Sequence, residues 1–377
     1  ELRKQKLPPK FHFWGENMFQ FMADSEFLLT KNNDAKEFCN SSYNLYRYLV
    51  LPFENALQNK KLTIIPDGKL SYIPFDALLT KLPDTTKTIE YNKLDFSIRQ
   101  YTFNYANSAN LLVNSKSKGK RNSIKTGAFA PVYRNGDIID YAGQQIPLIP
   151  LPGIQKEVDK IAKLVNTKLF AGDEATEDNF RKYAERFDIL HLAMHAFVND
   201  SLPALSSFAF TQTKSDDLLK NGLLNTADIY NLKLNANLIV LSSCNTGTGT
   251  LKKGEGIMSL ARGFLYAGCP SIIMSLWEVE DNSGTKIMSS FYQYLKKGKT
   301  KDEALRLAKL DYLENANSRL AHPHYWLGYV SIVENSPLFR SYDFYFFSLI
   351  FLAIAGITAE QIVRLKRARK KRDENQY

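Results

Sequence analysis

Short, almost wholly apolar segments alternate with amphipathic helical segments through the later part of this 377-residue chain. The segment Leu238-Ile-Val-Leu241 is typical, because consecutive apolar residues leave neither face of a strand suited to solvent. Such strands lie in the middle of a parallel sheet that helices cover on both faces, so the sequence predicts a three-layer α/β/α sandwich with a mostly parallel sheet. The predicted strands are 169–170, 189–194, 208–211, 238–243 and 271–277, and the predicted helices are 154–165, 177–184, 226–230, 256–266, 283–295 and 301–314.

The N-terminal part is predicted to form a smaller unit. Residues 35–58 have helical apolar periodicity, and the β-branched segment 62–66, the turn Asp67-Gly68 and the extended segment 70–74 together predict a hairpin. Because residue 1 is Glu and no signal pattern follows it, we expect the chain to be processed or to be part of a longer protein. The expected divisions are a helical lead-in (1–42) and one domain (43–336), which comprises an N-terminal subunit (43–113), a linker without apolar residues (114–123) and a core (124–336).

Charge and cysteine content exclude several classes of protein. The formal net charge is +10, but the tail 364–377 holds seven bases and two acids, so the rest is only mildly basic and no nucleic-acid surface is expected. Cys39, Cys244 and Cys269 are too few and too scattered for a disulfide framework, and no Cys or His spacing indicates zinc. No glycine-rich loop is followed by Lys and Ser or Thr, so we expect no nucleotide, metal or other cofactor.

A long apolar stretch lies near the C-terminus. Residues 344–359 carry no charge, and the stretch reaches residue 363 if Glu360 lies near a membrane interface. Aromatic residues precede it and the basic tail follows it, which is the pattern of a single transmembrane helix at 344–363 with the tail 364–377 in the cytoplasm. The body would then lie in the periplasm of a bacterial cell. The alternative is a buried or interfacial helix.

Two polar clusters come at the ends of predicted strands. His191 and His195 stand in and just beyond one strand, and Cys244 stands at the end of another. Carboxyl ends of parallel strands meet at one edge of a sheet, and the spacing of 49 residues between His195 and Cys244 is close to that of caspase-type peptidases. An imidazole beside a thiol favours the thiolate, and the glycines of 245–249 can bring backbone N–H groups toward an oxyanion. Taken alone, a cysteine at the end of a buried strand is more often an inert core residue, and a lone histidine is more often structural.

Ordered short motifs carry a stronger signal than either cluster. They are Leu62-Thr-Ile-Ile-Pro-Asp-Gly68, Ile73-Pro-Phe-Asp-Ala-Leu78, Leu151-Pro-Gly153, Gly172-Asp-Glu-Ala-Thr176, His191-Leu-Ala-Met-His195, Leu241-Ser-Ser-Cys-Asn-Thr-Gly247, Gly254-Glu-Gly256, Leu260-Ala-Arg-Gly-Phe-Leu-Tyr-Ala-Gly268, Ser275-Leu-Trp-Glu-Val-Glu-Asp281 and His322-Pro-His-Tyr-Trp326. With these motifs, residues from about 43 to 334 resemble a CHAT domain, the bacterial branch of the caspase- and separase-like clan of cysteine peptidases. The resemblance implies a caspase-like fold, peptide-bond hydrolysis and an upstream tetratricopeptide-repeat region.

The resemblance also implies roles for particular residues. By position, His195 resembles the catalytic histidine and Cys244 the nucleophile, and the backbone N–H groups of Ala196 and Cys244 would hold the oxyanion. The family commonly has Gly where this chain has Ala196, which retains the N–H. His191 resembles the histidine that packs within the strand.

Substrate specificity is predicted from the acids near this site. Glu280 and Asp281 follow the predicted strand 271–277 and would favour Arg or Lys at the P1 position of a substrate. Ser242 stands two residues before Cys244, where related peptidases often carry an Asp. The expected preference for a basic P1 residue therefore depends on Glu280 and Asp281, because Ser242 lacks the charge that an Asp would supply.

The sequence thus predicts a membrane-anchored cysteine endopeptidase that acts on a protein or peptide. Its activity would be controlled by a regulatory protein partner that binds the upstream repeats. The alternative is a catalytically silent caspase-like signalling scaffold or protein-interaction module, in which the Cys–His pair is present but the pocket never opens.

Overall fold

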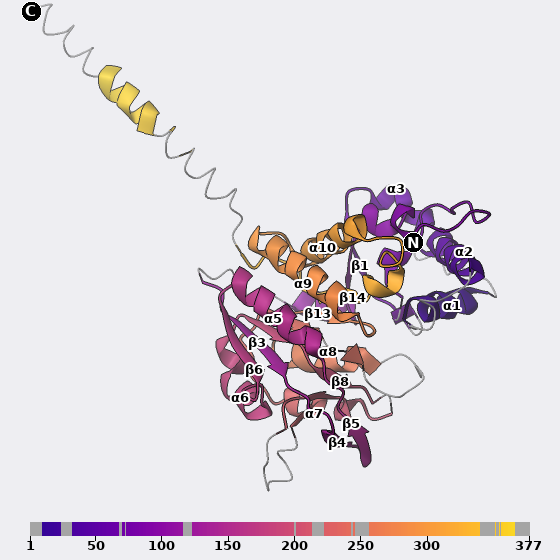
Figure 1. Ribbon diagram of the computed structural model, residues 1–377. Helices are drawn as coiled ribbons and strands as arrows, with labels where there is room; N and C mark the ends of the chain where they lie inside the picture. The colour runs from indigo at the N-terminus through magenta and orange to yellow at the C-terminus, as the bar shows by residue number, and fades with distance from the viewer. Residues whose placement is uncertain are drawn as a thin grey trace, which may run out of the picture.

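A sheet of eight strands runs through the protein (Figure 1). The computed structural model describes residues 10–23, 32–67, 70, 71, 73–115, 123–199, 201–212, 222–242, 244, 245, 256–339, 351, 354 and 356–365. All neighbouring strands of this sheet are parallel except the pair β13 and β14, so the predicted mostly parallel α/β sheet is confirmed. In spatial order the strands are β1 (Lys61–Ile64), β2 (Thr102–Tyr105), β14 (Tyr329–Val333), β13 (Ser271–Ser275), β11 (Leu238–Leu241), β7 (Ile189–Leu192), β3 (Thr126–Pro131) and β6 (Thr167–Gly172).

Helices cover both faces of the sheet. Helix α5 (Pro152–Leu164) leads from β3 toward the β6 edge, whereas α6 (Glu177–Tyr183) and α8 (Gly256–Tyr266) lead in the opposite direction, to β7 and β13. Because crossovers between parallel strands are right-handed, connections that run in opposite directions cover opposite faces. Helices α9 (Asp281–Lys296) and α10 (Lys301–Asn315) pack in a row beside α5 (Figure 1). The predicted helices in this region are confirmed.

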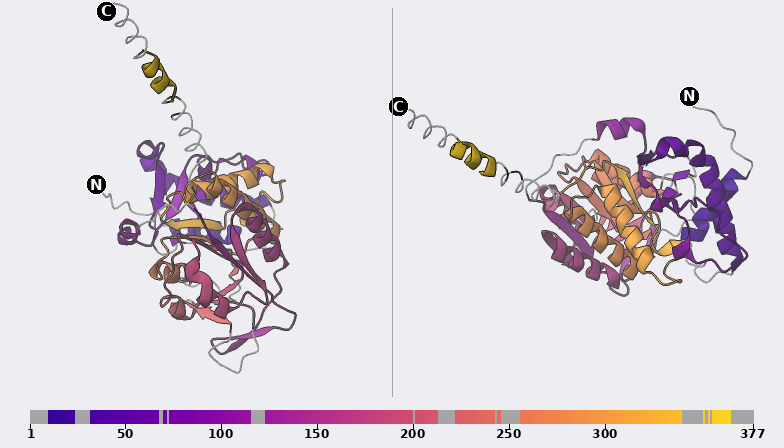
Figure 2. Two further views of the ribbon diagram at one scale, coloured as in Figure 1. Left: turned by 90° about the vertical axis from the view of Figure 1, so that its left-hand side faces the viewer. Right: turned by 90° about the horizontal axis from the view of Figure 1, so that it is seen from above.

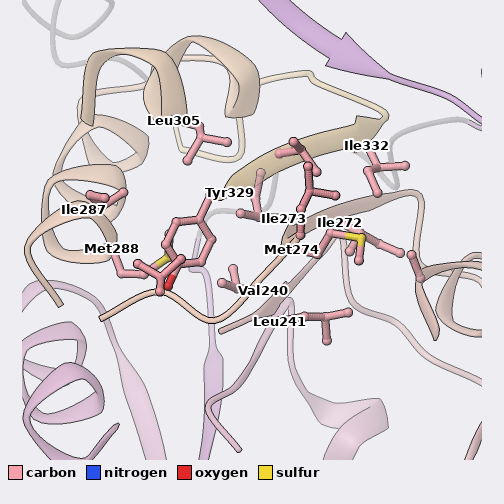
Figure 3. Packing of buried hydrophobic residues seen from close by; sticks show 14 of the residues in the cluster. Val240, Leu241, Ile272, Ile273, Met274, Ile287, Met288, Leu305, Tyr329 and Ile332 are labelled. Carbon is pink, nitrogen blue, oxygen red and sulfur yellow. The ribbon is translucent and has the colours of Figure 1, made fainter. Parts of the chain in front are cut away.

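The apolar strands predicted from the sequence form the centre of the core. All residues of β7, β11 and β13 are buried, as strands covered on two faces must be. Figure 3 shows side chains of β11, β13 and β14 packed together, with α9 and α10 above them. Val240 and Ile273 are completely buried there. Truncating Ile273 to Ala would cost about 2–5 kcal/mol of stability.

A second, smaller sheet lies beyond the carboxyl ends of the central strands. Its strand order is β10 (Leu223–Asn225), β9 (Ser207–Ala209), β8 (His195–Phe197) and β12 (Cys244–Asn245). A separate hairpin, β4 (Ile138–Tyr141) with β5 (Gln144–Pro147), connects β3 to α5. Its two-residue turn holds Ala142 and Gly143 at φ of 53° and 80°, as hairpin turns of this length require. The ring of Tyr141 stacks on Phe197 at 5.1 Å and joins the hairpin to β8.

Two N-terminal helices pack against each other and against the domain. In Figure 2 the indigo helices α1 (Phe11–Ala23) and α2 (Asn32–Leu49) lie side by side, and the rings of Phe21 and Phe38 stack at 4.7 Å between them. The predicted helix 35–58 ends at Leu49, because Pro52 has no N–H to donate. A 3₁₀ turn (Leu51–Phe53) and the short helix α3 (Glu54–Leu57) follow it.

The hairpin predicted from segments 62–66 and 70–74 is wrong. Strand β1 pairs in parallel with β2, and none of the described residues of 70–74 is in a strand. The chain instead makes a 3₁₀ turn (Phe75–Ala77), in which Asp76 forms a buried ion pair of 2.6 Å with Lys309 of α10. This contact is distant in sequence, so it fixes a conformation that the local pattern does not reveal.

The predicted membrane span 344–363 falls largely outside the described residues, as does most of the predicted linker 114–123. Residues 356–365 are helical, and all of them are exposed. A search of the described residues for a helix with the length and apolar character needed to cross a membrane finds none. The span remains a prediction.

Candidate active site

The two central strands β7 and β11 end side by side, and both chains continue into the small sheet. Leu192 and Leu241 are paired in register, and the N–H of Ser242 donates to the carbonyl of Leu192 at 3.0 Å. Beyond this point β8 and β12 pair in parallel, and Cys244 is in register with His195. The predicted strands 189–194 and 238–243 are therefore each two residues too long, because β7 ends at Leu192 and β11 at Leu241, and the chain then enters a strand of the other sheet.

This register brings together the predicted histidine and cysteine. Neighbouring strands lie about 4.8 Å apart, and residues in register occupy the same face of a sheet. The side chain of Cys244 lies outside what the structure describes. The backbone pairing nevertheless gives Cys244 and His195 adjacent positions at the carboxyl edge of the central sheet, where sites form in proteins of this class.

The imidazole of His195 is held on one nitrogen only. His195 is 2% exposed, and its Nε2 lies 2.6 Å from the carbonyl oxygen of Ile149. A carbonyl oxygen can only accept, so Nε2 carries the proton and Nδ1 of the neutral ring is left as an acceptor. Nδ1 is buried and has no hydrogen-bond partner among the described residues. Burial lowers the pKa of His195, and the hydrogen bond to Ile149 opposes that shift only partly, which keeps the ring neutral near pH 7.

The other histidine of the segment, His191, has partners on both nitrogens. It is completely buried in β7. Its Nε2 lies 2.8 Å from a carboxylate oxygen of Glu157 on α5, and its Nδ1 lies 3.2 Å from the hydroxyl of Tyr292 on α9. A continuous strand would place His191 and His195 on the same face of the sheet, but the chain leaves β7 at Leu192, before it reaches His195.

Ala196 lies within the small sheet, between Asn245 of β12 and Phe208 of β9. It is not among the residues with positive φ. Alanine therefore occupies this position without backbone strain, although the resemblance sets glycine there. Its assignment to an oxyanion site stays a prediction.

The three residues predicted to recognise substrate make contacts within the fold. Glu280 accepts hydrogen bonds from the N–H and the hydroxyl of Ser283, both to Oε2, and so caps the start of α9. Asp281 accepts the N–H of Gly153 at 3.0 Å, and a Cβ at Gly153 would come within 2.2 Å of the Asp281 carboxyl carbon. Ser242 shares a hydrogen bond of 3.0 Å with the hydroxyl of Tyr329. None of these bonds reaches His195, and substrate recognition by these residues remains a prediction.

Two residues of the site were not predicted from the sequence. Ile149 contributes only its backbone carbonyl, and 65% of its side chain is exposed. The nearby Leu151-Pro-Gly153 motif was the available signal. Tyr133 is buried beside His195 and donates its hydroxyl proton to the carbonyl of Ala209 at 2.6 Å. Nothing in the local pattern distinguishes it from a core tyrosine.

The part of the chain that the structure describes contains no group of three or more His, Cys, Asp or Glu residues that would hold a metal ion. His324 donates from Nδ1 to the carbonyl of Met22 at 2.9 Å, and the His322 ring packs against Phe21 and Tyr91. These two histidines therefore stabilise the packing of α1 against the domain.

Comparison with known proteins places these features in context. The chain is 25% identical over 334 residues to human "Tetratricopeptide repeat protein 28", which covers 78% of this chain and 13% of that protein. The mouse protein of the same name is 24% identical over 220 residues, 50% of this chain and 9% of its own length. This chain therefore spans only a small part of both curated relatives.

Two kinds of solved structure also match. The Saccharomyces cerevisiae separase–securin complex has a TM-score of 0.38 and 13% identity, over 66% of this chain and 14% of that chain. The Arg-specific cysteine proteinase gingipain R has a TM-score of 0.42 and 9% identity, over 88% and 76% of the two chains.

The CHAT domain family model matches residues 40–334, from within α2 to the residue after β14. The match includes both central strands that lead to the site, the hairpin before α5 and the paired positions His195 and Cys244. Since it covers well over half of the sequence, the chain belongs to the CHAT domain family.

Proposed function

We propose that this protein is a cysteine endopeptidase in which Cys244 is the nucleophile and His195 the general base and acid. The observation that carries the proposal is the register of β8 and β12, which pairs these two residues, together with the buried Nδ1 of His195, which has no hydrogen-bond partner among the described residues. Family membership supports the same assignment, because the CHAT domain resembles caspase-like cysteine peptidases.

The proposed reaction is acyl transfer through a thioester. Nδ1 of His195 takes the thiol proton of Cys244, and the thiolate attacks the peptide carbonyl carbon to give a tetrahedral oxyanion. The backbone N–H groups of Ala196 and Cys244 would stabilise that charge. His195 then gives the proton to the leaving amine as the C–N bond breaks, and water hydrolyses the thioester by the same route. The carbonyl of Ile149 keeps the imidazole oriented throughout, as the acceptor for Nε2–H.

The first experiment uses the full 377-residue chain with a library of peptides, and Cys244→Ala as its control. We expect cleavage that the variant lacks. An acyloxymethyl ketone probe should label Cys244, whereas Cys39 and Cys269 are completely buried and act as internal controls. Burial also raises the pKa of Cys39 to about 12, which suppresses its thiolate. Equal labelling of all three thiols would overturn the proposed dyad.

A second candidate function is a catalytically silent scaffold. The observation that favours it is the 2% exposure of His195, since a substrate cannot reach the ring without movement of the segments that cover it. A scaffold should bind the probe no faster at Cys244 than at the other cysteines, and it should cleave no peptide of the library. The tetratricopeptide repeats in the names of the curated relatives support a partner-binding region upstream in the same polypeptide.

We further propose a preference for Arg or Lys at P1, set by Glu280 and Asp281. Burial acts to raise the pKa of Glu280, but hydrogen bonds from Ser283 and Asn282 outweigh it and the pKa is lowered, so this carboxylate is ionised at neutral pH. Asp281→Asn keeps an acceptor for the N–H of Gly153 and removes one charge. We expect it to lower kcat/KM for Arg substrates about tenfold and to leave neutral substrates unchanged. An equal effect on both substrate types would refute a role in P1 recognition.

Membrane attachment through 344–363 is the last part of the proposal. The exposed apolar side chains of Ile354, Ile357 and Ile362 support it, together with the basic tail 364–377. The test is extraction of the full chain from lipid vesicles at alkaline pH. We expect the native chain to stay in the membrane and the double variant Ile354→Lys, Ile357→Lys to be released. Protection of the body, but not of the tail, from protease added on the cytoplasmic side would establish the proposed orientation.

A further inference from the structure

The ladder between β8 and β9 stops one pair short of His195. These antiparallel strands pair Ala196 with Phe208 and Phe197 with Ser207, so the next pair in the same register is His195 with Ala209. That pair is absent from the ladder. The hydroxyl of Tyr133 occupies its place, because it accepts the N–H of His195 at 3.1 Å and donates to the carbonyl of Ala209 at 2.6 Å.

One side-chain hydroxyl thus replaces a direct backbone hydrogen bond. A direct N–H···O bond would bring the two backbone atoms to about 2.9 Å from each other. With an oxygen atom between them, the strands must separate at this point. His195 is therefore held away from β9 at the position where it is in register with Cys244 of β12.

Tyr133 also contacts the imidazole itself. Its ring lies 4.6 Å from the His195 ring, centroid to centroid, with 39° between the planes. The side chain is 4% exposed, and it follows the end of β3. The adjoining backbone is fixed, since the N–H of Val132 donates to the hydroxyl of Thr211 at 3.1 Å and that hydroxyl donates to the carbonyl of Gly172 at 2.7 Å. Tyr133 is thus a rigid support on one side of the ring, and the carbonyl of Ile149 fixes Nε2.

We propose that Tyr133 is a positioning residue for His195. Its hydroxyl sets the backbone of His195 apart from β9, and its ring restricts the imidazole plane, so that Nδ1 is presented beside the position of Cys244. This inference rests on the proposed Cys–His dyad. Tyr133 exchanges no proton in the proposed reaction, and it acts only through the backbone and ring of His195.

The test compares Tyr133→Phe with Tyr292→Phe. Both variants remove a buried hydroxyl next to a histidine, and Tyr292 serves the other histidine, His191. For Tyr133→Phe we expect kcat to fall about tenfold or more at unchanged KM, because a misplaced base slows the chemical step and not substrate binding. For Tyr292→Phe we expect a similar loss of thermal stability with kcat unchanged. Equal effects of the two variants on kcat would overturn the proposal.

Two measurements do not depend on peptidase activity. The amide hydrogen of His195 should exchange slowly in the native protein and faster in Tyr133→Phe, and the ¹⁵N spectrum of the native ring should show a single Nε2–H tautomer that broadens in the variant. If the native protein cleaves no peptide but both signals change as expected, the positioning inference stands and the proposed function fails. If the His195 amide exchanges equally fast in both proteins, the inference fails whatever the activity.

Discussion

His191 and His195 lie four residues apart, in β7 and at the start of β8, and their rings have different surroundings. Both nitrogens of His191 contact side chains of the covering helices, through Glu157 and Tyr292. His195 has a backbone carbonyl on Nε2, and Nδ1 lies buried without a partner among the described residues. Both partners of His191 are buried side chains of the fold, whereas the neutral ring of His195, fixed on one nitrogen, can still accept a proton on the other.

The difference arises from the path of the chain. His191 belongs to β7 in the middle of the central sheet, and α5 and α9 cover it. His195 begins β8, after the chain has left that sheet. Its neighbours are the edge strand β12 and the residues just before and just after the β4–β5 hairpin. Residue type is therefore the same in both places, and the position relative to the sheet edge determines which histidine is available for chemistry.

Removal of each histidine provides the largest test of this comparison. We expect His195→Ala to lower the rate of Cys244 alkylation and of peptide cleavage by about three orders of magnitude, because the general base is lost. Its fold should persist with reduced stability, since the variant removes one hydrogen bond to the carbonyl of Ile149 and the ring contact with Tyr133. The rates are measured by stopped-flow alkylation and peptide hydrolysis. A comparable loss of rate in a folded His191 variant would contradict the division of roles.

Removal of Glu157, the carboxylate partner of His191, should lower stability and leave activity nearly unchanged. In Glu157→Ala the Nε2 atom of His191 loses its buried partner, which should cost about 2–4 kcal/mol of stability. Chemical denaturation measures this loss, and Glu157→Gln, which keeps an acceptor for Nε2 of His191, serves as the matched control with a smaller loss. Activity per folded molecule should remain within about twofold of the native value. A stable Glu157→Ala protein would show that the buried pair contributes no stability.

Two buried histidines with lowered pKa values, His195 and His322, should make the protein sensitive to acid. Burial lowers the pKa of His195 below its ordinary value of 6.5, so an NMR titration of the ring should give a midpoint below 6.5, and the acid limb of cleavage should follow it. Burial and the neighbouring His324 lower the pKa of His322 to about 3. Both groups bind protons more readily when unfolded, so stability should fall as pH decreases below 6.5. His322→Phe keeps the ring packing against α1 and should reduce this acid loss. A His195 midpoint at or above 6.5 would contradict the assignment of a neutral buried base.

Sequence patterns predicted the strands and helices whose burial is visible in their own order of apolar residues. Strand β11 and helices α5 and α9 were predictable because burial on two faces, or on one face of a helix, appears in the local order of apolar residues. The end of β7 at Leu192 was not predictable, because Ala193 and Met194 are as apolar and as buried as the strand before them. The parallel partner of β1 depends on contacts distant in sequence, including the pair of Asp76 with Lys309.

Some groups of the candidate site were predictable from the sequence, and others were not. His195 and Cys244 were predictable because their side chains are chemically distinctive and stand at strand ends. The carbonyl of Ile149 was not predictable, because every residue of the chain has a carbonyl and only the folded path selects one of them. The hydroxyl of Tyr133 was not predictable either. Its proposed role depends on the missing pair between β8 and β9, and Tyr133 belongs to neither strand.

The smallest expected effect concerns Ala196, where the resemblance sets glycine. Ala196 has no positive φ, and it lies between two strands of the small sheet. In Ala196→Gly the backbone N–H is kept, so we expect cleavage rates within about twofold of the native protein and a loss of about 0.5–1 kcal/mol of stability from added chain entropy. Peptide hydrolysis and thermal unfolding measure the two quantities. A large gain in activity would mean that alanine holds the backbone in an inactive conformation and that the silent scaffold is the correct description of the native chain. An unchanged rate would mean that the residue at position 196 does not limit activity, and that substrate access to the buried ring of His195 is the step to test next.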